Sequence, residues 1–168
     1  MRFRGRTPAS AAPLILLLTA RPVAHAQYEP AMTHVTPDEV TWSDSAEVPG
    51  LKIAVLAGDP RKAGPYTIRV KFPPGTMTRP HYHPEMRTVT VISGTWWAGA
   101  GDTFDPDATT PLAAGSFAIH FPKRTHFDGA KDDGAVVQIS GIGPSATIWV
   151  HPEAGHVWVD PAPGRTTK

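Results

Sequence analysis

The chain has 168 residues, of which 40% are hydrophobic and 18% charged, so it is long enough for about one domain. Its 19 prolines and 15 glycines favour many short elements over a few long helices. It contains no cysteine, which excludes disulfides, thiolate metal ligands and a cysteine nucleophile, and a net charge of +1 gives no electrostatic basis for nucleic acid as a partner.

The first 26 residues have the pattern of a secretory signal peptide. Three arginines within the first six residues precede an apolar run at 11–20, and the AHA at 24–26 has the A-x-A form that signal peptidase cuts. We expect cleavage after Ala26, which gives a periplasmic or secreted protein without a stable membrane anchor; an uncleaved anchor is the alternative. Because the leader holds four of the 16 basic residues and no acid, the mature chain carries a formal charge of −3.

After an N-terminal arm at 27–46, the sequence is dense in strand signals up to residue 152. The predicted strands are short, rich in β-branched or aromatic residues and bounded by Gly, Pro or Asp. Regularly spaced strands with turn residues between them predict an all-β sandwich or barrel over 47–152. The tail at 153–168 is expected to be partly disordered, because its last residues have little to bury. The strands are predicted at 51–58, 66–72, 87–94, 94–101, 115–121, 135–140 and 146–152.

The clearest turn signal is the SGT at 93–95. It predicts a hairpin in which a strand at 87–92 turns back into a second strand at 95–99. Helical signal is nearly absent, and only the TPDEV at 36–40 has the residues to start a single turn.

Two histidines one residue apart, His81 and His83, are the first candidates for chemistry. In a strand, residues two apart project on the same side, so both imidazoles would point to one face. Such a pair can chelate a metal ion, since imidazole suits Zn, Fe, Cu and Ni. The spacing alone is weak evidence, because histidine pairs are also common on exposed strands.

The residues around this pair resemble the first motif of the cupin superfamily, which runs G-x5-H-x-H-x3-E-x6-G. Gly75, His81, His83 and Gly94 fall in register with that motif. Arg87 stands in the glutamate position, which is a departure from it.

The second cupin motif, approximately G-x5-P-x-G-x2-H, is matched less well. Gly115 and His126 keep its overall spacing, but Phe121 and Lys123 stand in the proline and glycine positions, and Pro122 lies one residue late. The resemblance therefore rests mainly on the first motif and covers roughly 47–152.

The resemblance implies a single-domain jelly-roll β-barrel of the RmlC-like type, with six to eight strands. It also implies one divalent metal ion (Fe, Mn, Ni or Zn) held near the open end of the barrel by His81, His83 and His126. Cupins often dimerise, so a homodimer is expected by the same analogy.

Arg87 is the main objection to a metal. A guanidinium has only donors and cannot replace a carboxylate ligand. Three interpretations stay open: Arg87 turns away and leaves a three-histidine site, it clamps the carboxylate of a substrate, or it has abolished metal binding. Glu85 would share the face of His83 in a regular strand and could act as ligand or general base, but Pro84 makes that phase uncertain, and a rim carboxylate is the alternative.

The remaining candidates have structural explanations of at least equal weight. His120 is interpreted as a satisfied buried histidine or a donor to the site, and His34, His151 and His156 as surface residues. Gln138 either faces the cavity or makes a cross-strand hydrogen bond. Of the adjacent Trp96 and Trp97, one should face inward and one outward.

Two functions of different classes follow from these residues. The first is a metal-dependent enzyme, oxygenase-like or metal-assisted, that acts on a small organic molecule, with Arg87 orienting the substrate and Glu85 as base. The second is a small-molecule binding or sensing module that has kept the barrel and lost its metal, suggested by the missing glutamate.

Overall fold

The protein is described by a computed structural model over residues 31–160, and the predicted signal peptide and the last eight residues lie outside this range. Side chains alternate between buried and mostly half-buried along β3 (Gly64–Phe72) and β10 (Ala135–Gly143), as expected for strands with one face on the core. These two strands pair antiparallel over their whole length. Their inward residues form the centre of the core: Tyr66, Ile68, Val70, Phe72, Ala135, Val137 and Ile139.

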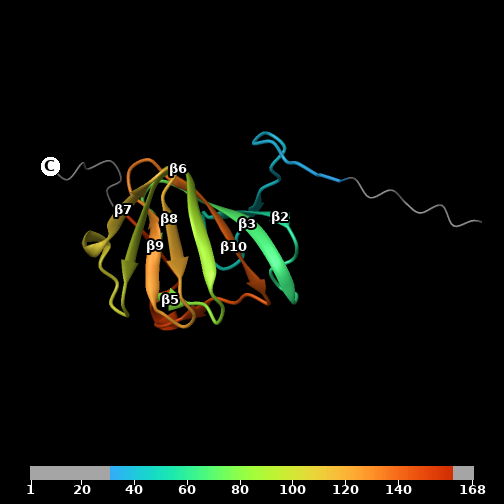
Figure 1. The fold of residues 1–168 in the computed structure, drawn as a ribbon. Helices are drawn as coiled ribbons and strands as arrows, with labels where there is room; N and C mark the ends of the chain where they lie inside the picture. Colours follow the sequence, from blue (N-terminus) through green and yellow to red (C-terminus); the bar gives the residue numbers. More distant parts are fainter. Residues whose placement is uncertain (1–30, 161–168) are drawn as a thin grey trace, which may run out of the picture. The chain divides into compact units, whose positions relative to one another are not determined.

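The strands form one curled, all-antiparallel sheet with two parts (Figure 1). The first part has the order β1-β2-β3-β10-β6, and β8 pairs with the far side of β6. Besides β3 and β10, its members are β1 (Ser43–Asp44), β2 (Lys52–Ala57), β8 (Phe117–His120) and the first half of β6 (Arg87–Ala100).

The second part has the order β6-β9-β4-β12 and begins with the second half of β6. β7 also pairs with β6, and the short strand β5 pairs with both β9 and β11. Two short 3-10 turns, at Pro106–Ala108 and Pro152–Ala154, join strands of this part. Its members are β4 (Thr76–Thr78), β5 (His81–Tyr82), β7 (Thr110–Ala113), β9 (His126–Ala130), β11 (Ile148–Trp149) and β12 (Val157–Val159). This is the jelly-roll arrangement expected for the all-β class.

The hairpin predicted at 93–95 is not formed, because β6 runs through this segment. The segment is one continuous strand of 14 residues that pairs with β8 and β10 before Gly94 and with β7 and β9 after it. Gly94 has a φ of +72°, and a Cβ there would lie 2.1 Å from the carbonyl oxygen of Gly134. The glycine therefore serves a bend that passes the strand from one part of the sheet to the other, beside a register shift in β10.

Most other predicted strands are present with shifted ends, whereas six short strands were not predicted. The segment at 146–152 holds only the two-residue β11 and the start of a 3-10 turn. Strand pairing begins at Ser43 and ends at Val159, beyond 47–152 at both ends. No helix within 31–160 has the length and apolar character needed to cross a membrane. The strands missed are β1, β4, β5, β7, β9 and β12.

Candidate metal centre and ligand cavity

Three histidines come together where β5 meets β9. Prolines at 80 and 84 limit β5 to two residues, and His81 lies directly opposite His126 in the strand pairing. His83 follows just outside the strand but keeps its ring on the same side. The ring centroid of His81 lies 4.9 Å from that of His83 and 4.4 Å from that of His126. The ring centroids of His83 and His126 are 5.2 Å apart.

Backbone carbonyls fix the orientation of each of these rings. The Nδ1 atoms of His81, His83 and His126 lie 2.8, 2.8 and 3.0 Å from the carbonyl oxygens of Arg79, Ala146 and Arg124 respectively. A carbonyl can only accept, so each Nδ1 carries the proton and each Nε2 presents a lone pair. Outer hydrogen bonds of this kind are typical of histidines that bind metals.

The cluster is buried, which keeps its imidazoles neutral at pH 7. Loss of hydration lowers the pKa of His81 to about 4 and that of His120 to about 2. The pKa values of His83 and His126 are also lowered, chiefly by burial, and for His83 the nearby Arg87 cation adds to the effect. Neutral imidazoles are the form that binds a metal ion.

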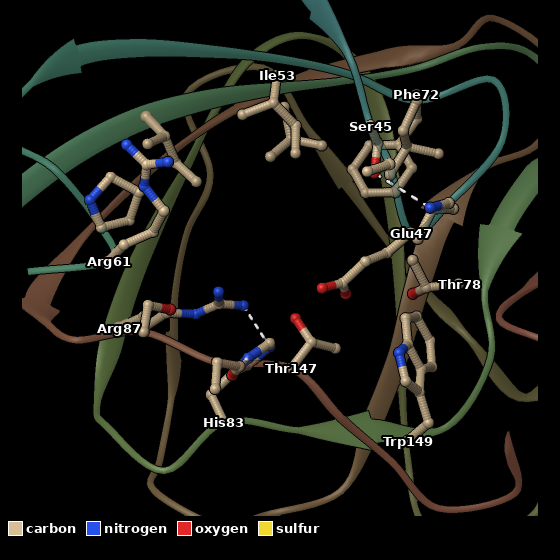
Figure 2. Close-up of a pocket in the computed structure, with 18 residues that line it drawn as sticks. Ser45, Glu47, Ile53, Arg61, Phe72, Thr78, His83, Arg87, Thr147 and Trp149 are labelled. Carbon is tan, nitrogen blue, oxygen red and sulfur yellow. Dashed lines mark hydrogen bonds between the residues drawn. The ribbon is translucent and has the colours of Figure 1, made fainter.

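Arg87, at the start of β6, points into this cluster and does not turn away from it. Its Nη2 donates a hydrogen bond to Nε2 of His83, as Figure 2 shows. The side chain is 8% exposed, and within residues 31–160 no carboxylate forms an ion pair with it. Its Nε is buried without a hydrogen-bond partner there. A guanidinium in this state can take an anion as a partner.

Glu85 lies apart from the histidine cluster. The bend at Pro84 breaks the strand phase, and the Glu85 carboxylate accepts hydrogen bonds from the hydroxyls of Tyr66, at 3.2 Å, and Ser145. Its second oxygen is buried without a partner among the described residues. Glu85 therefore belongs to a polar network and contacts Ser145, which lines the cavity, but does not line the cavity itself. Its role as metal ligand or general base stays a prediction.

A cavity of about 340 Å³ opens over His83 and Arg87. Most of its wall is apolar and comes from the inner face of β2 and β3 and from the segments at 45–48 and 145–149. Figure 2 shows the carboxylate of Glu47 reaching into the cavity from the wall that faces Arg87, with Thr147 near it. Arg61 is a second cation in the wall. The cavity can therefore hold a small organic ligand with at least one charged group.

His120 differs from the prediction of a satisfied buried histidine. Its ring centroid is 3.8 Å from that of His126, and its Nδ1 is buried with no hydrogen-bond partner among residues 31–160. His156 is also more than a surface residue, because it stacks on Trp149 at 4.3 Å and its Nδ1 lies 3.0 Å from the carbonyl oxygen of Glu47. His34 and His151 are exposed, as expected.

The structure decides which of the two adjacent tryptophans faces inward, and whether Gln138 faces the cavity or makes a cross-strand hydrogen bond. Trp96 is buried in the core, while Trp97 is half-buried with Lys131 at 4.1 Å from its ring. Gln138 accepts a hydrogen bond from Arg69 at 3.2 Å, which is the cross-strand structural contact.

Three residues of the site were missed by sequence reasoning. Tyr66 and Ser145 carry no motif, because their place depends on strands far apart in the chain. Asp128 had a signal: it stands two residues after His126 in β9, so both side chains share a face. Its Oδ2 lies 3.7 Å from Nε2 of His126.

The histidine donors fit a divalent metal ion. One nitrogen from each of His81, His83 and His126 lies within 4.8 Å of the others, and Nε2 of His126 has no hydrogen-bond partner in the described part of the chain. The contact of Arg87 with His83 opposes metal binding at that one donor. The residues therefore form a histidine-rich potential metal site.

This fold is that of a cupin. The chain belongs to the ChrR cupin-like family, because the model of the ChrR cupin-like domain matches residues 30–138.

Solved structures support the fold at low sequence identity. The polyketide cyclase RemF of Streptomyces resistomycificus has a TM-score of 0.60 at 14% identity, over 71% of this chain and 85% of its own. KdgF from a Halomonas species has a TM-score of 0.52 at 18% identity, over 67% and 94%. The DMSP lyase DddQ of Ruegeria pomeroyi has a TM-score of 0.56 at 15% identity, over 69% and 64%. No curated protein matches the chain significantly.

Proposed function

We propose that this protein is a metal-dependent cupin enzyme that acts on a small organic anion. The observation that carries the proposal is the convergence of three buried imidazoles, each with Nδ1 held by a backbone carbonyl and Nε2 turned to the others. His81, His83 and His126 would hold one divalent ion (Fe, Mn, Ni or Zn). Such an ion polarises a substrate oxygen or activates water. The similarity in fold to a polyketide cyclase and a lyase is compatible with an enzyme.

The cavity supports a carboxylate or similar anion as the substrate group. Arg87 would bind this group through its guanidinium, which is buried and lacks a carboxylate partner among the described residues. Binding of the anion would also draw Arg87 away from Nε2 of His83. The apolar wall around Phe72 and Trp149 would pack against the rest of the substrate and exclude water.

Glu85 would act on protons through Ser145. The Ser145 hydroxyl lines the cavity and donates a hydrogen bond to the Glu85 carboxylate. A proton taken from a substrate by the Ser145 oxygen could therefore pass to Oε1 of Glu85 without movement of the backbone.

A specific observation favours a second function, that of a non-catalytic binding or sensing cupin. Arg87 already donates to the lone pair of His83 that a metal would need. If this contact persists in solution, the protein would use the same cavity to bind an anion without a metal.

We further propose that the protein works in the periplasm or outside the cell after cleavage behind Ala26, with a small molecule and not nucleic acid as its partner. A homodimer is also proposed. It is supported by exposed apolar side chains on the outer face of β8 and just after it, at Phe117, Ile119 and Phe121.

The first test is the metal content of the protein purified without a histidine tag, measured by elemental analysis. We expect close to one equivalent of a divalent metal per chain. His126→Ala should lose the metal while keeping the β-sheet signal in circular dichroism. His34→Ala is the matched control, because His34 is exposed and far from the cluster in the sequence, and it should retain the metal.

Protein that stays free of metal after incubation with each of the four ions would contradict the enzyme and support the binding module. Loss of metal in both histidine variants to the same extent would contradict the assigned site.

A further inference from the structure

A second group of three metal donors lies beside the predicted one. His120 at the end of β8 and His126 and Asp128 in β9 each offer a ligand atom, and these atoms lie within 4.8 Å of one another. Nε2 of His126 is 3.7 Å from Oδ2 of Asp128. Donors on one metal ion at about 2.1 Å lie roughly 3 to 3.5 Å apart, so a small adjustment would bring these atoms onto a common ion.

Asp128 is held in a way that suits a ligand. Its Oδ1 accepts a hydrogen bond from Nε1 of Trp96 at 3.3 Å, and its backbone N–H and C=O both bond the hydroxyl of Thr78. These contacts leave Oδ2 turned toward His126. The side chain is 5% exposed, and no lysine or arginine between 31 and 160 forms an ion pair with it. A buried carboxylate without a direct ion pair to a lysine or arginine is costly, and a divalent ion would offset that cost.

Each of the two histidines of this group also has one ring nitrogen without a hydrogen-bond partner among the described residues. Nδ1 of His120 and Nε2 of His126 are both buried, and neither has a hydrogen-bond partner in the described residues. A metal between them would satisfy both atoms at once. In the predicted group, by contrast, the lone pair of His83 is already taken by Arg87.

The two groups are open to different cavities. His83 and Arg87 face the cavity of about 340 Å³ already described. His120 and His126 face another cavity, of about 480 Å³, which lies among β6, β7 and β8 and also contacts Trp96. An ion could therefore reach the second group without passing Arg87.

We propose that, while Arg87 contacts His83, the divalent ion binds to His120, His126 and Asp128. His126 belongs to both groups, so a single ion would occupy one position at a time. Two imidazoles and a carboxylate form a ligand set that suits non-haem Fe(II), Mn and Zn. Asp128 supplies the negative charge that the missing glutamate of the cupin motif does not. This inference rests on the proposed metal binding and not on the proposed catalysis.

The test compares the affinity of chelator-treated protein for Zn²⁺ and Co²⁺ by titration against a metal indicator. Asp128→Asn keeps an oxygen for Trp96 but removes the charge, and His120→Gln removes the second imidazole. Each should weaken binding by about 100-fold or more, because loss of outer contacts alone costs about 10- to 100-fold. His83→Gln is the matched variant of the other group, and it should weaken binding and alter the visible Co²⁺ spectrum clearly less than Asp128→Asn or His120→Gln does.

The outcomes separate this inference from the proposed function. If the unaltered protein binds neither Zn²⁺ nor Co²⁺, the proposed metal-dependent function and this inference are both wrong. If it binds and His83→Gln weakens binding as much as or more than Asp128→Asn, the ion sits among His81, His83 and His126, and only this inference is wrong. Circular dichroism of each metal-free variant checks that it is folded, and the Co²⁺ spectrum gives a second measure if one variant is not.

Discussion

At the scale of single residues, Arg87 decides how the histidine cluster can be used. It fills the glutamate position of the cupin motif, yet its side chain reaches the same cluster and donates to His83. The sequence motif predicted that His81, His83 and His126 meet, and the structure brings them together; their role as ligands stays a prediction. The motif did not predict that Arg87 points inward, because the direction of a long side chain depends on what surrounds it.

Replacing Arg87 by glutamine should strengthen metal binding. The change removes a cation beside the ligand atoms and frees Nε2 of His83, and charges a few ångströms apart interact by several kcal/mol at an effective dielectric of about 20. We expect the affinity for Zn²⁺ to rise at least about tenfold, measured by competition with a chelator. Arg69→Gln, on a side chain bonded to Gln138, is the control for loss of one arginine and should have no effect. Weaker binding in Arg87→Gln would show that Arg87 supports the site.

At the scale of elements, the strands with a regular alternation of buried and partly exposed residues could be predicted from the sequence. β3 and β10 show clear alternation, and both were predicted. β9 was missed because all five of its residues are buried, so its HFDGA sequence has no alternation. The hairpin at 93–95 was wrong because a glycine with positive φ serves a bend as well as a turn, and sequence alone does not tell these apart.

The bend in β6 makes Gly94 sensitive to substitution. Gly94→Ala would combine a positive φ with a Cβ placed 2.1 Å from the carbonyl oxygen of Gly134. Gly115→Ala is the matched control, since Gly115 has a φ of +89° and open space around a Cβ. The control should lower the free energy of unfolding by about 1–3 kcal/mol, and Gly94→Ala by about 1–3 kcal/mol more. Equal losses in urea denaturation would mean that the strand accommodates the side chain.

At the scale of the whole molecule, the fold buries His81, His83 and His126 together and places the half-buried His120 beside them. The pKa of His81 falls to about 4 and that of His120 to about 2, with those of His83 and His126 also lowered by burial. In the unfolded chain these residues titrate near 6.5. Between these values the unfolded state binds more protons than the folded state.

The stability of metal-free protein should therefore fall as the pH is lowered from about 6.5 toward 4. Each histidine can contribute up to about 1.4 kcal/mol per pH unit to this loss. The measurement is the free energy of unfolding in urea at several pH values between 7 and 5. His120→Phe should reduce the slope of the free energy of unfolding against pH by the contribution of one histidine. A free energy that does not change over this range would contradict neutral burial of the cluster.

The position of the cavity wall in the chain has a consequence for how this protein can differ from its relatives. All the candidate metal donors lie within 30–138, the stretch that the family model matches. Ser145, Thr147 and Trp149, which close one side of the ligand cavity, come after that stretch. One side of the cavity wall thus lies outside the segment that carries the candidate metal donors, so that side could change during divergence while the donors are inherited. A relative that shares the histidines therefore need not bind the same ligand.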